Sequence, residues 1–260
     1  MGAILELKNV SKKFGGITAC RNISLAIETG GLFGLIGPNG AGKTTVFNLI
    51  TGVYPVSEGG IFFQQQAING KRPDQIVLLG IARTFQNIRL FKNLTVLDNV
   101  CISVDNYITY NTAECLLRLP KVTACEKQIR ETAMAYLSDV GLRDKAFARA
   151  DSLPYGLQRK LEIARALALK PKLLLIDEPA AGMNPEESLV LADLIRSIHR
   201  QYDLTILLIE HHMDVVMTLC DRIFCMNFGE ELAVGTAGEI QENPAVLTAY
   251  LGEGYRRVGS

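Results

Sequence analysis

The residues from Gly37 to Thr45 combine three glycines, one lysine and two hydroxyl side chains in a spacing that suits phosphate chemistry. The run Gly-Pro-Asn-Gly-Ala-Gly-Lys-Thr-Thr matches the pattern GxxxxGK[ST]. Glycines let backbone N–H groups turn toward phosphate oxygens, and a helix expected over Lys43–Ile50 directs its positive end at the same anion. Lys43 can reach the β and γ phosphates, and the Thr44 hydroxyl can hold Mg²⁺. The spacing predicts a nucleotide site whose contacts are Gly37, Asn39, Gly40, Ala41, Gly42, Lys43, Thr44 and Thr45.

Two carboxylates follow the apolar run Leu173–Ile176. Four large apolar residues followed by Asp177 and Glu178 describe a buried strand whose carboxyl end meets a ligand crevice. Asp177 is then placed to bind Mg²⁺ through water, and Glu178 can polarise the water that attacks a phosphate. Taken alone, Asp-Glu-Pro could be a solvated turn. The phosphate loop in the same chain favours the catalytic interpretation.

The elements that position these groups alternate between strand and helix patterns, which predicts an α/β core. Ile23, Leu25 and Ile27 fall on one face of an early alternating strand. Short buried strands are expected at Leu32–Ile36, Leu173–Ile176 and Thr205–Ile209. Residues 54–84 are predicted to form turns and short strands.

The stretch from about Asn93 to Asp151 has a different character, with few β runs and several helical patterns. Its clearest helix face holds Ile129, Ala133, Tyr136, Leu137 and Val140, and Gly141 can end that helix. A further helix is expected after Asn184, which can cap it, with Pro185 in the first helical position and Glu187 completing a capping box. The sequence therefore predicts a helical subdomain inserted into an α/β core.

Composition limits the possible functions. The 260 residues carry 27 basic and 27 acidic side chains, so a formal net charge of zero gives no general attraction to nucleic acid. The six cysteines include no CxxC pair, which argues against a zinc site, and we expect reduced thiols, with Cys220 and Cys225 as packing residues. We find no signal-peptide pattern and no apolar run near the roughly 20 residues that span a bilayer.

Residues 151–168 carry a more specific resemblance. The run Leu153-Pro-Tyr-Gly-Leu-Gln158, with the helix that follows it, resembles the signature motif of the ATP-binding-cassette (ABC) family. The resemblance covers nearly the whole chain. It implies a P-loop NTPase (RecA-like) core with an antiparallel β subdomain and an inserted helical subdomain. The expected single domain is 1–252, with its core in 1–92 and 152–252, the helical subdomain at about 93–151, and a flexible tail at 253–260.

The resemblance also assigns roles to residues that would be weak signals alone. Gln86 resembles the glutamine-loop residue that touches Mg²⁺ and links to a membrane subunit. His211 resembles the switch histidine at the γ-phosphate, whereas its neighbour His212 receives no role. Phe14 stands where the family places an aromatic ring against adenine. In such proteins two cassettes face head to tail, so the signature residues of one contact the ATP of the other; here these are Tyr155, Gly156 and Gln158.

Three residues depart from the family pattern. Pro154 stands where the signature usually has serine, Tyr155 where it usually has a second glycine, and Asn184 where the segment Ala180–Asn184, which resembles the D-loop, usually has aspartate. These changes put in doubt the strength of the site offered to a partner cassette. They leave the chain's own phosphate loop and Glu178 intact.

The same departures resemble one subfamily, the ATPase subunits of branched-chain amino acid importers, and within it the larger of the two ATPases. This likeness is carried by Phe85–Phe91, Ala180–Pro185, the pair Glu210–His211 and the ending Ala249–Glu253. It implies an ATPase that uses ATP and Mg²⁺ at the cytoplasmic face of the inner membrane. The implied partners are integral membrane permeases, a second ABC ATPase in a homodimer or heterodimer, and indirectly an extracytoplasmic substrate-binding protein, with no nucleic acid.

Other functions remain open at this point. The lipopolysaccharide-export ATPase shares parts of the pattern, including the Tyr-Leu-Gly-Glu ending. A soluble ABC ATPase acting on DNA or ribosomes would be expected to carry a second cassette, a long coiled coil or a basic arm, and the sequence has none of these. A non-catalytic nucleotide sensor could do without Glu178 and His211, so their presence favours an active ATPase.

Overall fold

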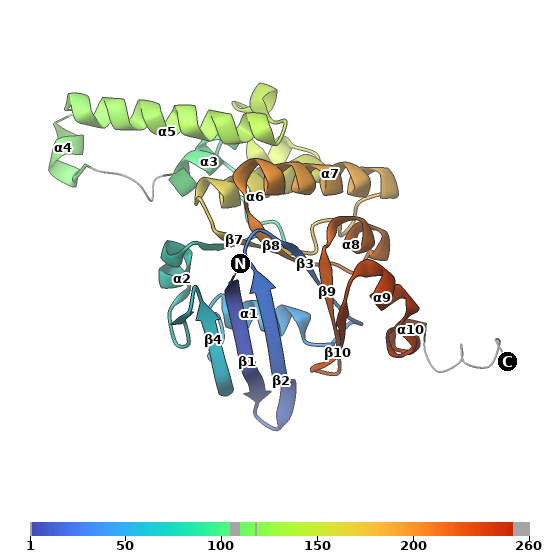
Figure 1. The fold of residues 1–260 in the computed structure, drawn as a ribbon. Helices are drawn as coiled ribbons and strands as arrows, with labels where there is room; N and C mark the ends of the chain where they lie inside the picture. The colour runs from blue at the N-terminus through green and yellow to red at the C-terminus, as the bar shows by residue number, and fades with distance from the viewer. Residues whose placement is uncertain (1, 105–109, 118, 252–260) are drawn as a thin grey trace. The chain divides into compact units, whose positions relative to one another are not determined.

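The computed structural model describes residues 2–104, 110–117 and 119–251, which form two compact units (Figure 1). One comprises Met1–Arg83 and Lys172–Ser260, and the other comprises Thr84–Pro171. They are called the strand unit and the helical unit below. The division falls after Arg83 and after Pro171, whereas the sequence suggested boundaries near 93 and 151. The tail expected at 253–260 lies outside the described residues.

The larger sheet of the strand unit has six strands, and all its neighbours are parallel except the edge strand β10. Every residue of β3, β7 and β8 is buried, as expected for strands covered on both faces. The predicted strands are confirmed, and β7 extends one residue further to include Asp177. In spatial order the strands are β10 (Glu230–Gly235), β9 (Arg222–Asn227), β3 (Leu32–Ile36), β8 (Thr205–Ile209), β7 (Leu173–Asp177) and β6 (Ile81–Arg83).

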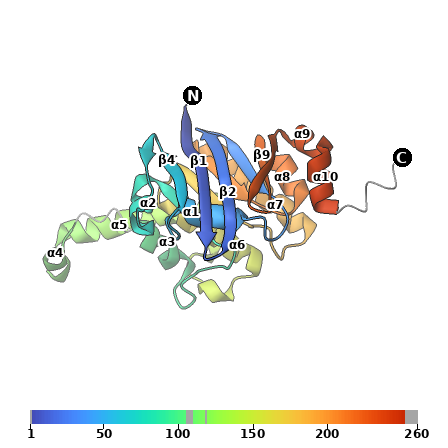
Figure 2. The same ribbon diagram turned by 90° about the horizontal axis from the view of Figure 1, so that it is seen from below.

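The smaller sheet is antiparallel. Its strands, in order, are β2 (Ile17–Glu28), β1 (Ala3–Phe14), β4 (Glu58–Phe63) and β5 (Gln66–Ala67). The alternation predicted for β2 is confirmed, because Ile23, Leu25 and Ile27 are all buried. One apolar core includes Leu7 of β1, Phe47 of α1 (Lys43–Ile50) and Leu175 of β7. Helix α1 therefore shares its packing with both sheets, and Figure 2 shows it behind β1 and β2.

The remaining helices of the strand unit are α2 (Pro73–Leu79), α7 (Pro185–Tyr202), α8 (Met213–Leu219), α9 (Ala237–Glu242) and α10 (Pro244–Leu251). The start of α7 is as predicted: the Asn184 side chain accepts the Glu187 N–H at 2.9 Å, and Glu187 accepts the Asn184 N–H in return at 3.1 Å. The prediction of only turns and short strands over 54–84 is wrong at α2. Pro73 occupies the first turn of that helix, and Gln75 accepts the Arg72 N–H at 3.0 Å.

The helical unit is built from α3 (Val96–Val104), α4 (Thr112–Leu116), α5 (Pro120–Asp139) and α6 (Tyr155–Ala168), with two short 3₁₀ turns, η2 (Arg143–Lys145) and η3 (Ala150–Ser152). The predicted apolar face of α5 is confirmed, since Ile129, Ala133 and Leu137 are buried. Gly141, at φ 71°, follows its last turn. Within the described ranges, no helix has both the length and the apolar character needed to cross a bilayer.

The pairing of β1 with β4 requires a glycine at position 59. Gly59 has φ 84°, and a Cβ there would lie 2.3 Å from the Asn9 carbonyl oxygen and 2.5 Å from that of Lys8. Gly70 has a similar φ of 72°, but a Cβ there would meet nothing within 4 Å. The two positions share the same backbone cost and differ only in the clash.

We predict that Gly70→Ala lowers the free energy of unfolding by about 1 kcal/mol, because alanine disfavours the left-handed conformation. Gly59→Ala should lower it by at least about 2 kcal/mol more, because the β1–β4 ladder must also open. Urea unfolding followed by circular dichroism measures both. Equal losses in the two variants would contradict the close approach of β1 to Gly59.

Candidate active site

The predicted phosphate loop connects β3 to α1 within the strand unit. Gly37 begins the loop at φ 150°, and a Cβ there would lie 2.2 Å from the carbonyl oxygen of Met226 in β9. Glycine is therefore required where the loop passes the neighbouring strand. The amide of Val46 donates to the Gly42 carbonyl at 3.0 Å, so the first helical turn closes directly behind the loop. This is the strand–loop–helix context that the sequence pattern needs.

Lys43 is buried inside this loop, with 6% of its surface exposed. Its ammonium group donates to the carbonyl oxygens of Gly37 at 2.7 Å and Pro38 at 3.1 Å. Burial lowers the pKa of Lys43, and the negative charges of Glu178 and Asp177 act in the opposite direction. The lysine is thus held at the centre of the loop, with carboxylates close enough to influence its proton.

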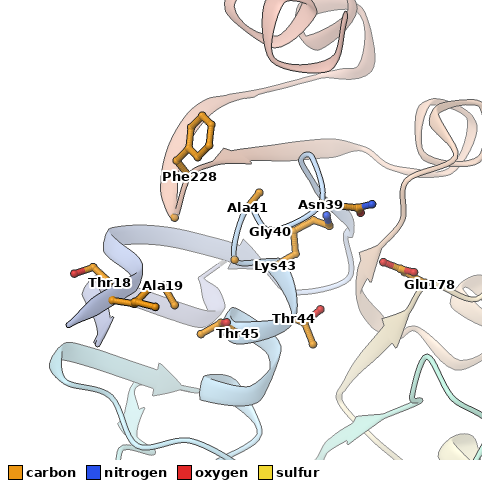
Figure 3. Close-up of a pocket in the computed structure, with 13 residues that line it drawn as sticks. Thr18, Ala19, Asn39, Gly40, Ala41, Lys43, Thr44, Thr45, Glu178 and Phe228 are labelled. Atoms are coloured by element: carbon orange, nitrogen blue, oxygen red, sulfur yellow. The ribbon is translucent and has the colours of Figure 1, made fainter. Parts of the chain in front are cut away.

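A cavity of about 420 Å³ lies over the loop (Figure 3). It is lined by all seven residues from Asn39 to Thr45 and by Glu178, so most of the predicted nucleotide contacts come together. Figure 3 shows Glu178 at one end and Thr18, Ala19 and Phe228 at the other, with the loop between them. The cavity therefore has a carboxylate end and an apolar end.

The apolar end contains residues that the sequence analysis missed. Ile17, Thr18 and Ala19 come from the start of β2, and Phe228 comes from the turn between β9 and β10. Ile17 and Phe228 are 73% and 88% exposed, so both side chains present apolar surface to solvent. No motif joins segments about 200 residues apart, so only the fold reveals this part of the cavity.

Phe14, the expected partner of adenine, does not line the cavity. Its ring meets that of Tyr54 edge to face at 5.1 Å, and the Lys12 ammonium lies 4.8 Å from its centre. Phe14 is nevertheless the cross-strand neighbour of Ile17, which does line the cavity. Its role at a base stays a prediction.

Asp177 ends β7 and is 2% exposed. Its Oδ2 accepts a hydrogen bond from Nη2 of Arg83 at 2.6 Å, and the Nη1 of Arg83 donates to Asn48 in α1 at 2.7 Å. Arg83 ends the adjacent strand β6, and its side chain is also almost fully buried. A buried charge is tolerated in a protein interior when it is paired in this way. Arg83 was not among the predicted site residues.

Glu178 follows β7 in an unusual backbone conformation. Its φ is 45°, in the left-handed region that a residue with a side chain seldom adopts. Its N–H donates to the carbonyl of Ile209, the last residue of β8, at 2.9 Å. Its Oε2 lies 3.7 Å from Nδ1 of His211, which follows β8. Strained residues of this kind often occur at functional sites, where the surrounding structure maintains them.

The other predicted site residues belong to the helical unit, where they surround Arg159. This buried arginine donates to the carbonyls of Phe85, at 2.7 Å, and Gln86, and it pairs with Glu162 at 3.2 Å. Burial raises the pKa of Glu162, while the Phe85 N–H and the Arg159 charge oppose the shift. The backbone at Gln86 is therefore fastened to α6.

The signature residues occupy the first turn of α6. Tyr155 is its first residue, and its hydroxyl accepts a hydrogen bond from Arg159 at 2.8 Å. Gly156 follows, and the Gln158 side chain donates to the Leu153 carbonyl at 2.8 Å. Tyr155, which departs from the family pattern, is thus part of the arrangement that fastens Gln86. The roles of Gln86, Tyr155, Gly156 and Gln158 at a nucleotide stay predictions.

Two buried cysteines lie in strands beside the loop. Cys20 in β2 has its Sγ 3.7 Å from the Gly42 carbonyl oxygen, and Cys225 lies in β9. Burial raises the pKa of each thiol to about 11, although the Lys43 charge opposes the shift at Cys225. The interpretation of Cys220 and Cys225 as packing residues agrees with their burial.

Comparison with known families matches the ABC transporter description to residues 20–181. The description of the branched-chain amino acid ATP-binding cassette transporter matches residues 230–256. The chain is 41% identical, over 96% of its length and 98% of the relative's, to the high-affinity branched-chain amino acid transport ATP-binding protein LivG of Salmonella typhimurium. It is equally similar to the corresponding protein BraF of Pseudomonas aeruginosa, with the same coverage.

Solved structures agree with these matches. The ADP conformation of an ATP-binding cassette of an ABC transporter superposes with a TM-score of 0.84 at 30% identity, covering 97% of this chain and 100% of the other. A dimeric post-hydrolysis cassette bound to ADP and phosphate gives a TM-score of 0.75 at 25% identity, covering 90% and 98%. The predicted fold, a P-loop NTPase core with an antiparallel sheet and a helical part, is confirmed.

We predict that Arg83→Met lowers the free energy of unfolding by about 3–5 kcal/mol, because it leaves the Asp177 carboxylate buried without its ion pair. Arg21→Met provides a matched control, since it removes the exposed pair with Glu230, whose N–O distance is 2.9 Å. That control should change stability by no more than about 1 kcal/mol. Similar urea midpoints for the two variants would show that the buried Arg83–Asp177 pair contributes no more to stability than the exposed Arg21–Glu230 pair.

Proposed function

Because this chain belongs to the ABC transporter family of ATP-binding cassettes, we propose that it hydrolyses ATP to drive an importer of branched-chain amino acids. The main observation behind the proposal is the cavity, which is lined by Asn39–Thr45 of the phosphate loop and by Glu178. A phosphate-binding loop facing a carboxylate can both hold a triphosphate and activate water beside it.

The different chemistry of the two ends of the cavity determines the orientation in which the nucleotide binds. The phosphates lie at the loop, where Lys43 and the backbone N–H groups up to Thr45 neutralise their charge. Lys43 then exchanges its bonds to the loop carbonyls for bonds to the β and γ phosphates. The nucleoside lies toward Ile17 and Phe228, with Phe14 one cross-strand position away.

The residues at the phosphate end suit Mg²⁺. The Thr44 hydroxyl lines the cavity, and Asp177 ends the strand that leads to Glu178. Hydroxyl and carboxylate oxygens are the ligands that Mg²⁺ prefers. Asp177 already accepts from Arg83, so its contact is through water, and Gln86 is the third proposed ligand. When bound, the ion neutralises charge on the phosphates.

Glu178 is the proposed general base. Its carboxylate accepts a proton from the water that attacks the γ-phosphate, which makes the water a better nucleophile. His211 is the proposed donor to the γ-phosphate. The 3.7 Å separation between its Nδ1 and Oε2 of Glu178 is short enough for both side chains to face one reacting group.

Two cassettes form the active assembly in this proposal. Tyr155, Gly156 and Gln158 of one chain contact the ATP held by the phosphate loop of another. ATP then favours the closed dimer because only that state gives both chains phosphate contacts. The partner is a second copy or a related ATPase, and the dimeric cassette structure supports this arrangement.

The cargo assignment has separate support. The match over residues 230–256 is to a branched-chain amino acid subfamily, and the relatives at 41% identity carry the same cargo in their names. The chain would bind permeases peripherally at the cytoplasmic face of the membrane, through Gln86 and the helical unit. A substrate-binding protein would act on the far side.

We predict that Glu178→Gln retains ATP affinity and lowers kcat by at least about 100-fold, because the amide cannot accept the proton of water. Lys43→Ala should instead raise the dissociation constant for ATP by about tenfold or more, because a charged hydrogen-bond donor is removed. Isothermal titration and phosphate release measure the two effects. Normal turnover by Glu178→Gln would remove Glu178 from its proposed role.

We also predict that Glu178→Gln, trapped with ATP in native membranes, copurifies with two hydrophobic permeases and an ABC ATPase. Lys43→Ala treated in the same way provides the control, because it should bind little ATP and retain fewer partners. Mass spectrometry identifies the captured chains. Recovery of ribosomal or DNA-bound partners would leave the ATPase assignment intact and refute the transport assignment.

A further inference from the structure

Glu210 is a fully buried acidic residue that the proposed mechanism does not use. It follows β8 directly and has no solvent exposure. Its Oε1 accepts the N–H of Ala180 at 2.9 Å. Its Oε2 accepts the backbone N–H groups of His211, at 2.8 Å, and His212, at 3.0 Å, and it lies 3.0 Å from Nδ1 of the His212 ring. Three nitrogens therefore lie within hydrogen-bonding distance of Oε2 and one lies within that distance of Oε1.

These bonds join the two segments that carry the proposed catalytic side chains. Glu178 is held from one side, because its N–H donates to Ile209 in β8. Two residues later the chain is held again, because Ala180 donates to Glu210. The chain is thus held at the Glu178 nitrogen and at Ala180, on either side of the Glu178 Cα, and the φ of Glu178 is 45°. The Glu210 carboxylate therefore helps to maintain the strained conformation that directs Glu178 into the cavity.

His212 extends this connection to His211. Its ring packs against the His211 ring, with centroids 4.2 Å apart and planes 36° apart. Nδ1 of His211 lies 3.7 Å from Oε2 of Glu178 and also 3.7 Å from Oε2 of Glu210. The order Glu210, His212, His211, Glu178 is thus a continuous series of contacts from a buried charge to the cavity. The sequence analysis gave His212 no role.

A metal ion is a weaker explanation of the same cluster. Single ligand atoms of Glu210, His211 and His212 all lie within 4.8 Å of one another. Oε2 of Glu210, however, already accepts two backbone N–H groups. A cation there would have to displace these bonds, and the two N–H groups would then lose their acceptor. The contacts fit a hydrogen-bonded support better than a coordination site.

We propose that Glu210 and His212 are positioning residues, which hold His211 and Glu178 in the geometry that hydrolysis needs. The Nδ1–H of His212 donates to Glu210, and this bond sets the plane of the side-chain group that packs against His211. Neither residue contacts the nucleotide. The inference rests on the proposed roles of Glu178 and His211 and adds the groups that support them.

The test compares His212→Asn with His212→Gln. The amide nitrogen of asparagine can occupy the position of Nδ1 and keep the bond to Glu210, whereas that of glutamine reaches the position of Nε2. We expect His212→Gln to lower kcat about tenfold and His212→Asn no more than about threefold, because misplaced catalytic groups slow the chemical step. The KM for ATP should stay within about twofold in both, since neither variant alters the phosphate loop.

Glu210→Gln provides a second measurement. The amide keeps the size of the side chain but turns an NH₂ group toward one set of backbone donors. We expect kcat to fall at least about tenfold without a matching change in KM. If this variant does not fold, the pair of His212 variants still decides the question.

His199→Asn is the control for histidine replacement. Nε2 of His199 lies 3.0 Å from the Gly30 carbonyl oxygen, in the same unit but outside the cavity. This variant should leave kcat unchanged, whatever it does to the melting temperature. ¹⁵N spectra provide a check without kinetics, because His212 should carry a proton on Nδ1. A proton on Nε2 alone would overturn the inference.

The outcomes separate this inference from the proposed function. Normal kcat in both His212 variants, with Glu178→Gln inactive, would refute the positioning role and leave the catalytic assignment unchanged. Normal hydrolysis by Glu178→Gln would refute the catalytic assignment itself. Equal losses of kcat in His212→Asn and His212→Gln would show that the bond from Nδ1 to Glu210 is not what matters.

Discussion

The register between β7 and β8 is the constraint on which the candidate site depends. Asp177 pairs with Ile209, so the two strands end at the same level of the sheet. The residues that follow, Glu178 and Glu210, therefore leave the sheet side by side. A shift of one strand by one residue would direct its side chains to the opposite face relative to the other strand. The pairing of β7 with β8 thus determines how far apart the backbones of Glu178 and Glu210 lie, independently of their side-chain contacts.

Buried charge is the second organising principle of the strand unit. Lys43, Asp177 and Glu210 are each less than 10% exposed. Each is compensated differently: the lysine by loop carbonyls, Asp177 by a guanidinium, and Glu210 by backbone amides and an imidazole. A buried charge without such a partner would destabilise the folded state. Each charge therefore requires a polar or oppositely charged group beside it.

Local patterns in the sequence predicted the parts of the site that are contiguous in the chain. The phosphate loop has a fixed spacing, and the strand before it is short and wholly apolar, so loop and helix could be assigned together. Phe228 gave no comparable signal, and the sequence assigned no role at the site to Arg83 or Glu210. Their partners are distant in sequence or lie on neighbouring strands, and only the tertiary fold brings them together. Helix α2 lies in the range 54–84, which was predicted to hold turns and short strands, although a proline such as Pro73 is also favoured in a first helical turn.

The burial of Cys20 and Cys225 has a consequence for the chemistry of the cell. With pKa values near 11, only about one thiol in ten thousand is ionised at pH 7. The thiolate is the form that attacks disulfides and reacts with peroxides. Burial therefore keeps these two thiols beside the phosphate loop in the protonated form, which is the less reactive one.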